Sequence, residues 1–364
     1  MTELSAPERL HNIQALRGVA ALGVLFAHLA VIERRFGGGA LLPGWVDLGL
    51  AGVDLFFVVS GFVMVYVTRN VKAGGRSALT FLYKRATRIY PLYWLVSLAV
   101  LAVFLIRPEY VNSSQGNKVD IIASFLLAPQ DKLPLLQVGW TLVHEMYFYI
   151  TFSIFVLAPR RILPAFLGVW GVLTVAGFGV GLDKVNPWTD VAFNPLTLEF
   201  LMGAGVALLI NSGWSRGAIA ALTASAAALG GAFILRIGSY PDLLASDLMR
   251  TIVFGPAFAL MVYGFVALER RGRFFPPRLL RVLGDASYSL YLTHLLTISA
   301  LGRIWAAAAG PGVWDNVILL PLIAVAAIAA AVATYALVER PLLSWSRRAA
   351  PFRNARSDAP SEAA

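Results

Sequence analysis

The chain has 364 residues, of which 58% are hydrophobic and only 14% are charged. A soluble domain has about 25% charged residues, so this composition excludes an ordinary soluble enzyme and predicts an all-α, polytopic membrane helical bundle. The absence of cysteine excludes disulfides and thiolate chemistry, and we attribute the net charge of +10 to membrane topology rather than to a nucleic-acid partner.

Ten apolar segments are long enough to be read as membrane spans. They cover residues 12–32, 48–68, 86–106, 138–158, 162–180, 192–210, 216–235, 248–268, 286–306 and 316–338. The apolar segment 120–128 is too short to span, and we expect it to be interfacial or re-entrant. The first segment is too long for a signal peptide and lacks a small-residue cleavage site, so we expect it to remain as a span.

The basic residues predict the orientation. With the N-terminus in the cytoplasm, 20 Lys and Arg residues fall inside and 9 fall outside, Arg250 being counted among the outer ones. This bias predicts that both termini are cytoplasmic and that the number of spans is even. We expect an integral membrane domain at residues 1–345, and a disordered cytoplasmic tail at residues 346–364 because that segment is rich in Arg, Ser, Pro and Ala.

The first span contains two ionisable residues, Arg17 and His28. Eleven positions correspond to three helical turns within about 20°, and to a rise of about 16 Å, so both side chains lie on one stripe. Ionisable groups inside a membrane are costly and mark functional sites, and histidine is well suited to general-base work near neutral pH.

The second span begins with GVDLFFVVSGF, in which Asp54 lies near the outer end and Ser60 lies deeper. Six positions separate these two residues, so they do not share a helical face. We treat both as residues that support the site, and Asp54 also fits an interfacial cap.

The segment RATRIYPLYW places Arg85 and Arg88 three residues apart, at the cytoplasmic mouth of the third span. Such a pair occupies one helical face, and forked guanidinium groups bind phosphate or pyrophosphate well. Positive-inside anchoring, with Tyr90, Tyr93 and Trp94 as an interfacial belt, explains the same residues equally well.

The segment GWTLVHEMYFY places Glu145 inside an aromatic-rich span, between Trp140 and Tyr149, which we expect to support the site or line its cavity. A buried carboxylate needs a partner, and His28 fits at least as well as the adjacent His144, whose side chain points about 100° away. A carboxylate that orients an imidazole is a recurring catalytic pairing, whereas a structural pair that joins two helices is the alternative.

Two further spans contain ionisable residues: Glu199 in NPLTLEFLMGAG and His294 in DASYSLYLTH. Each fits either a cavity-lining group or an interhelical hydrogen bond. No cluster has metal-ligand spacing, so we expect no metal.

Taken together, these segments resemble the membrane-bound acyltransferase family 3, the O-acyltransferases of bacterial surface and secreted glycans. The resemblance covers almost the whole chain and includes Arg17 with His28, GVDLFFVVSGF, RATRIYPLYW, GWTLVHEMYFY, SYSLYLTH at 287–294 and VERP at 338–341. GWTLVHEMYFY with NPLTLEFLMG is most similar to the exopolysaccharide acetyltransferase branch. Against the common family wording WSLSxE, this chain has Thr141 and Val143 where the family has serines.

The resemblance implies an enzyme of the bacterial inner membrane that transfers an acyl group, acetyl in the first instance, from cytoplasmic acyl-CoA to a sugar hydroxyl. It implies that Arg85 and Arg88 bind CoA phosphates, that His28 is the catalytic histidine and that Glu145 is its partner acid. From the spacing we add Arg17 to the donor site. Succinyl or longer donors, acceptors from macrolides to exopolysaccharides, and either direct transfer or an acyl-histidine remain open.

A transporter or flippase for a glycan or lipid-linked substrate is the main alternative, with His28, Glu145 and Arg17 as its path. No internal repeat is evident, which counts against that class. The cytoplasmic arginine pair also distinguishes the two, because a thioester enzyme needs it and a proton path does not. The intact set of polar residues argues against a non-catalytic subunit or sensor. Membrane lipids are expected partners in every case.

Overall fold

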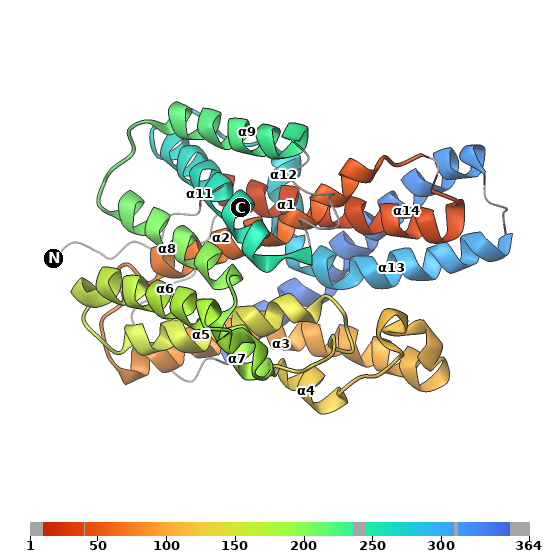
Figure 1. Cartoon of the computed structure of the whole chain (residues 1–364), viewed down its shortest axis with the longest axis horizontal. Helices are drawn as coiled ribbons and strands as arrows, with labels where there is room; N and C mark the ends of the chain where they lie inside the picture. The colour runs from red at the N-terminus through yellow and green to blue at the C-terminus, as the bar shows by residue number, and fades with distance from the viewer. Residues whose placement is uncertain (1–9, 40, 236–244, 309–311, 350–364) are drawn as a thin grey trace.

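The computed structural model describes residues 10–39, 41–235, 245–308 and 312–349. Within these residues the chain is helical and has no strand, which confirms the all-α bundle (Figure 1). The long helices are α1 (His11–Ile32), α2 (Gly52–Val67), α3 (Gly75–Ile106), α5 (Gly139–Val156), α6 (Leu163–Gly179), α8 (Leu196–Asn211), α9 (Ala218–Leu235), α11 (Asp247–Arg270), α13 (Ser287–Ala308) and α14 (Val313–Thr334). The short ones are α4 (Ile121–Leu126), α7 (Pro187–Phe193), α12 (Arg278–Asp285) and α15 (Arg340–Arg348).

Each of the ten predicted spans falls on one of the long helices. In the part of the chain that the structure describes, seven helical stretches are long and apolar enough to cross a membrane: His11–Gly37, Gly44–Val67, Gly75–Ile106, Arg160–Gly179, Pro187–Asn211, Asp247–Arg270 and Val313–Arg348. The remaining three predicted spans lie on α5, α9 and α13, and the total of ten stays a prediction.

Large apolar side chains point outward from several of these helices. Leu105, Val172 and Val325 have exposed fractions of 72%, 67% and 63%. So many exposed aliphatic groups would be unfavourable in water, whereas hydrocarbon solvates them. The protein is therefore a multi-pass membrane protein.

Helix α3 begins eleven residues earlier than the predicted span at 86–106. Gly74 has a φ of +143°, a conformation that glycine adopts readily, and the helix starts at the next residue. Arg85 consequently lies ten residues from the first residue of α3, or about 15 Å along the axis. The arginine pair therefore lies inside a helix that begins before the predicted span, and its position at the cytoplasmic mouth of that span stays a prediction.

Aromatic residues of α3 hold the short helix α4 in place. The Tyr93 hydroxyl donates to the carbonyl of Ser124 over 2.6 Å, and the Trp94 indole donates to that of Phe125 over 2.9 Å. Tyr90 bonds the carbonyl of Leu126 in the same way. These side chains satisfy the last carbonyls of a six-residue helix, so they do more than form the interfacial belt that the sequence suggested.

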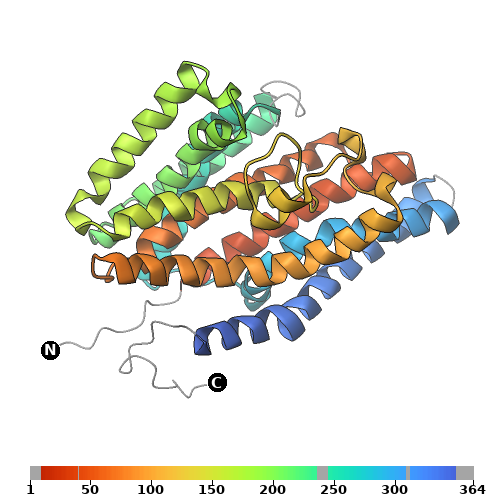
Figure 2. The ribbon, with the colours of Figure 1, turned by 90° about the horizontal axis from the view of Figure 1, so that it is seen from below.

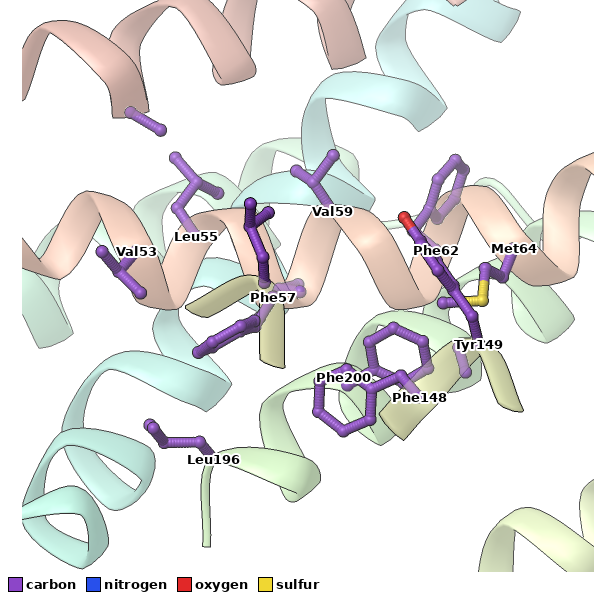
Figure 3. Packing of buried hydrophobic residues seen from close by; sticks show 14 of the residues in the cluster. Val53, Leu55, Phe57, Val59, Phe62, Met64, Phe148, Tyr149, Leu196 and Phe200 are labelled. Carbon is purple, nitrogen blue, oxygen red and sulfur yellow. The ribbon is translucent and has the colours of Figure 1, made fainter. Parts of the chain in front are cut away.

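Helices α2 and α8 cross with their backbones in close approach. A Cβ atom on Gly61 would lie 1.9 Å from the carbonyl oxygen of Phe200, and one on Gly203 would lie 1.8 Å from that of Val58. Beside this crossing, aromatic rings fill the core, and Phe148 stacks on Phe200 with ring centroids 4.0 Å apart (Figure 3). Glycine pairs of this kind let helices pack tightly where no hydrophobic effect draws them together.

The helix that follows α14 widens into one π turn, η7 (Tyr335–Glu339), before α15. Pro341 lacks an N–H and would clash with the carbonyl four residues earlier, which favours such a change of register. Glu339, the last residue of the π turn, is only 2% exposed.

The described ends of the chain, at the start of α1 and the end of α15, lie at the same end of the bundle (Figure 2). The Tyr83 hydroxyl donates to the carbonyl of Ser346 over 3.1 Å and ties α15 to α3. Because α15 continues to Arg348, helix extends past the predicted domain boundary at residue 345. The rest of the predicted tail, from residue 350, lies outside the described residues.

Candidate active site

One cavity, with an open volume of about 840 Å³, lies among α1, α2, α3, α5 and α13. Its polar lining brings together six of the residues singled out in the sequence: Arg17, Ser60, Arg85, Arg88, Glu145 and Tyr149. The remaining lining includes Phe56, Thr141, Tyr288 and Tyr291. A cavity lined mostly by apolar side chains with a few convergent polar groups is typical of small-molecule sites.

Glu145 is bound by two hydroxyl groups. The Ser60 Oγ atom on α2 donates to Glu145 Oε1 over 3.0 Å, and the Tyr149 hydroxyl donates to the same oxygen. Glu145 and Tyr149 are four residues apart on α5, so they share one face of that helix. The carboxylate is therefore fixed on the cavity wall by its own helix and by α2.

The two arginines of α3 have different partners. Arg88 forms an ion pair with Glu339, whose second oxygen also accepts a hydrogen bond from the Ser289 hydroxyl over 2.5 Å. Arg85 lies over the rings of Phe81 and Tyr149, at 5.5 and 5.6 Å from their centroids. Among the described residues, no carboxylate lies within ion-pair distance of Arg85.

The third arginine of the cavity, Arg17, belongs to α1. Its only described hydrogen bond is a long one, 3.4 Å, to the side-chain oxygen of Gln14. Three guanidinium groups thus line the cavity, whereas only two carboxylates among the described residues are near them. Glu145 lies in the lining, and Glu339 forms the ion pair with Arg88. The excess of positive charge favours an anionic ligand.

His28 does not line this cavity. Its Nδ1 atom is 3.0 Å from the carbonyl oxygen of Val24 and 3.2 Å from Nε2 of His294 on α13. Tyr291 lines the cavity, and its ring centroid is 6.0 Å from that of His294. A layer of aromatic side chains thus connects the cavity to the histidine pair.

The predicted pairing of His28 with Glu145 is wrong. Glu145 bonds Ser60 and Tyr149, whereas His28 bonds Val24 and His294. His144, the other candidate, packs instead against the rings of Phe57 and Trp140. Sequence spacing along α1 and α5 could not reveal that α13 supplies the partner of His28.

A second polar cluster lies away from the cavity, where α2, α8 and α11 meet. Asp54 accepts two hydrogen bonds from Arg250, at 3.1 and 2.9 Å, and Glu199 lies beside them, fully buried. The Arg250 guanidinium is also 5.8 Å from the ring centroid of Trp140. Asp54 and Trp140 therefore join helices through Arg250, and Asp54, Glu199 and Trp140, which were predicted to support the site or its cavity, do not line the cavity.

Sequence reasoning missed two buried charges. Arg250 was counted in an outer loop although it falls within the predicted span 248–268, and that position was the available signal. Glu339 appeared only as part of the VERP segment, and nothing in that segment pointed to Arg88. Within the described part of the chain, no group of three His, Asp or Glu side chains could hold a metal.

The fold and the cavity define a multi-pass membrane protein with a basic intramembrane site and an adjacent histidine pair. A family model described as an acyltransferase domain matches residues 10–336, and the chain belongs to this family, the membrane-bound acyltransferase family 3. It is therefore an acyltransferase.

The curated relatives agree with this family. The chain is 31% identical to the exopolysaccharide production protein ExoZ of Rhizobium meliloti, over 82% of this chain and 91% of that protein. It is 26% identical to the acyltransferase MdmB of Streptomyces mycarofaciens, over 98% and 97% of the two chains. It is 22% identical to the O-acetyltransferase OatA of Staphylococcus aureus, over 81% and 51%. The first similarity supports the exopolysaccharide-like branch, and no solved structure gives a significant match.

Proposed function

We propose that this protein is an O-acyltransferase of the bacterial inner membrane that moves an acyl group, acetyl in the first instance, from cytoplasmic acyl-CoA to a hydroxyl of a cell-surface or secreted glycan or glycolipid. The observation that supports an acyl-CoA donor is the cavity with its excess of guanidinium groups. The acceptor half rests on the similarity to proteins named for exopolysaccharide production and O-acetyl transfer.

The donor phosphates bind at the basic end of the cavity. Arg85 offers a guanidinium group without a carboxylate partner among the described residues, and Arg17 offers a second. Arg88 contributes charge while Glu339 holds it in place. Since α1 is continuous from Arg17 to His28, about 16 Å of helix separates the two residues, and an extended pantetheine arm bridges that distance.

His28 acts as the general base. The acceptor hydroxyl gives its proton to His28 while its oxygen attacks the thioester carbonyl, and the proton then passes to the departing CoA thiolate. The products are the acylated sugar and free CoA. In this proposal the acyl group passes the cavity residue Tyr291, whose ring contacts both Phe56 and His294, to reach His28. Glu145 shapes the wall of the donor channel through Ser60 and Tyr149 and does not orient the base.

The test uses purified protein in detergent, radiolabelled acetyl-CoA and a crude extract of cell-surface glycans. We expect wild type to transfer label to a glycan and His28→Ala to be at least about 100-fold slower, because a general base contributes 10²- to 10⁴-fold. His11→Ala removes a histidine outside the cavity and serves as the matched control. If no acyl-CoA is consumed by wild type, the transporter alternative replaces this proposal.

A further inference from the structure

Two histidines from different helices meet inside the bundle. The His28 ring of α1 and the His294 ring of α13 have centroids 5.0 Å apart, and Nδ1 of His28 lies 3.2 Å from Nε2 of His294. His294 is 1% exposed, whereas His28 keeps part of its surface accessible. The inner histidine is therefore closed off behind the outer one.

Backbone carbonyl groups determine which ring nitrogen of His28 and of His294 carries the hydrogen. Nδ1 of His294 is 2.9 Å from the carbonyl oxygen of Leu290, and Nδ1 of His28 is 3.0 Å from that of Val24. A carbonyl oxygen only accepts, so both Nδ1 atoms carry a hydrogen and, in a neutral imidazole, both Nε2 atoms are bare. The single Nδ1 hydrogen of His28 is then shared in a three-centre hydrogen bond between the carbonyl oxygen of Val24 and the bare Nε2 of His294, and Nε2 of His28 keeps a free lone pair.

We propose that His294 is a positioning residue for His28: its Nε2 accepts a hydrogen bond from His28 Nδ1–H, fixes the ring and stabilises the imidazolium that forms when His28 Nε2 takes the acceptor's proton. This rests on the proposed function of His28 as the base. In catalytic triads a carboxylate occupies this place. Here a neutral imidazole does so, which avoids burying a second charge in the membrane.

The surroundings support this assignment. Among the described residues no carboxylate bonds His28, and Glu145 is engaged by Ser60 and Tyr149. The Tyr291 ring packs against His294, and its hydroxyl is 2.8 Å from that of Thr141, so the inner histidine is held from the side of the cavity. His294 thus has one donor, Nδ1, directed at Leu290, one acceptor, Nε2, directed at His28, and little room to rotate.

The hydrogen bond itself can be measured without any enzymatic assay. The chain has four histidines, so solid-state NMR of ¹⁵N-histidine-labelled protein in bilayers resolves them, and single variants assign them. We expect His28 and His294 both to be Nδ1–H tautomers, and His28→Asn to shift the Nε2 signal of His294. An Nε2–H tautomer at His294, or an Nε2 signal that does not respond to His28→Asn, would overturn the proposal.

Kinetics test the role of the bond. We expect His294→Phe, which fills the space without an acceptor, to lower kcat about 10- to 100-fold with KM for acetyl-CoA unchanged, as for loss of a hydrogen bond to a charged group. His294→Gln restores an acceptor and should recover part of the rate. His144→Phe, a buried histidine among aromatic rings away from His28, is the control and should keep wild-type kcat.

The outcomes separate the two proposals. If His28→Ala is inactive while His294→Phe keeps full kcat, the positioning role fails and the proposed function stands. If wild type consumes no acyl-CoA, the proposed function fails, and the positioning role fails with it even where the NMR spectra show the hydrogen bond. If His294→Phe raises KM and leaves kcat unchanged, His294 belongs to donor binding and the positioning role is overturned.

Discussion

Arg85 and Arg88 lie on one face of α3, yet their surroundings assign them different tasks. Arg88 is neutralised by the buried Glu339, whereas Arg85 meets only aromatic rings and the cavity. A buried ion pair that loses one partner leaves an uncompensated charge, which costs about 3–5 kcal/mol. A guanidinium group without a carboxylate partner has its charge available to a ligand.

We therefore expect Arg85→Gln to weaken acetyl-CoA binding about 10-fold or more with little change in stability, since a charge-assisted hydrogen bond is worth about 1.5–3 kcal/mol. Arg88→Gln should instead lower the thermal unfolding midpoint in detergent, and Arg88→Gln with Glu339→Gln should restore most of it. Calorimetric titration and thermal unfolding measure the two effects. Equal losses of affinity and stability in both single variants would contradict this division.

For individual residues, the sequence predicted which side chains share the cavity more accurately than it predicted which side chains bond to one another. Helical spacing correctly placed Arg85 beside Arg88, and Arg17, Ser60, Glu145 and Tyr149 do share a cavity. Spacing within one helix says nothing about the neighbouring helix, so the partners of His28 and Arg88 came only from the packing. Both partners, His294 and Glu339, lie more than 240 residues away along the chain.

The crossing of α2 and α8 determines how Ser60 on α2 and Glu199 on α8 are positioned. A methyl group added at Gly203 would be 1.8 Å from a backbone oxygen. A methyl group added at Gly205, two residues later, would have no atom within 4 Å. Backbone cannot move aside as a flexible side chain does. The crossing therefore depends on the glycine hydrogen at this position.

We expect Gly203→Ala to destabilise the protein by about 1–3 kcal/mol, the usual cost of overpacking, and to lower transfer by displacing α2. Gly205→Ala is the matched control on the same helix and should be neutral or slightly stabilising, because alanine favours helix by up to about 1 kcal/mol over glycine. Thermal unfolding in detergent distinguishes them. Equal stability of the two variants would mean that the close approach is not rigid.

The elements themselves were largely predictable because each apolar run is long and continuous, and the ten predicted segments all coincide with helices. The errors fall at the ends. Hydropathy marks the part of α3 suited to hydrocarbon, whereas the polar residues 75–84 continue the same helix beyond it. Likewise α15 follows α14 through a π turn that no apolar pattern reveals.

For the whole molecule, the basic residues and the fold point to one orientation. Twenty of the basic residues fall on the predicted inner side, and moving Arg250 from the outer loops into the bundle strengthens that bias. The two described ends of the chain lie at one end of the bundle, as an even number of spans requires (Figure 2). This predicted orientation places the loop before α3, which contains Lys72, in the cytoplasm.

Because the chain has no cysteine, single cysteines report this orientation directly. Lys72→Cys and Lys118→Cys each remove one basic residue from an exposed site, one on each predicted side. We expect a membrane-impermeant maleimide to label Lys118→Cys on intact cells, and Lys72→Cys only after permeabilisation. The reverse pattern would turn the start of α3 and the Arg85 cavity toward the outside, where no acyl-CoA is supplied, and would remove the cytoplasmic donor from the proposed reaction.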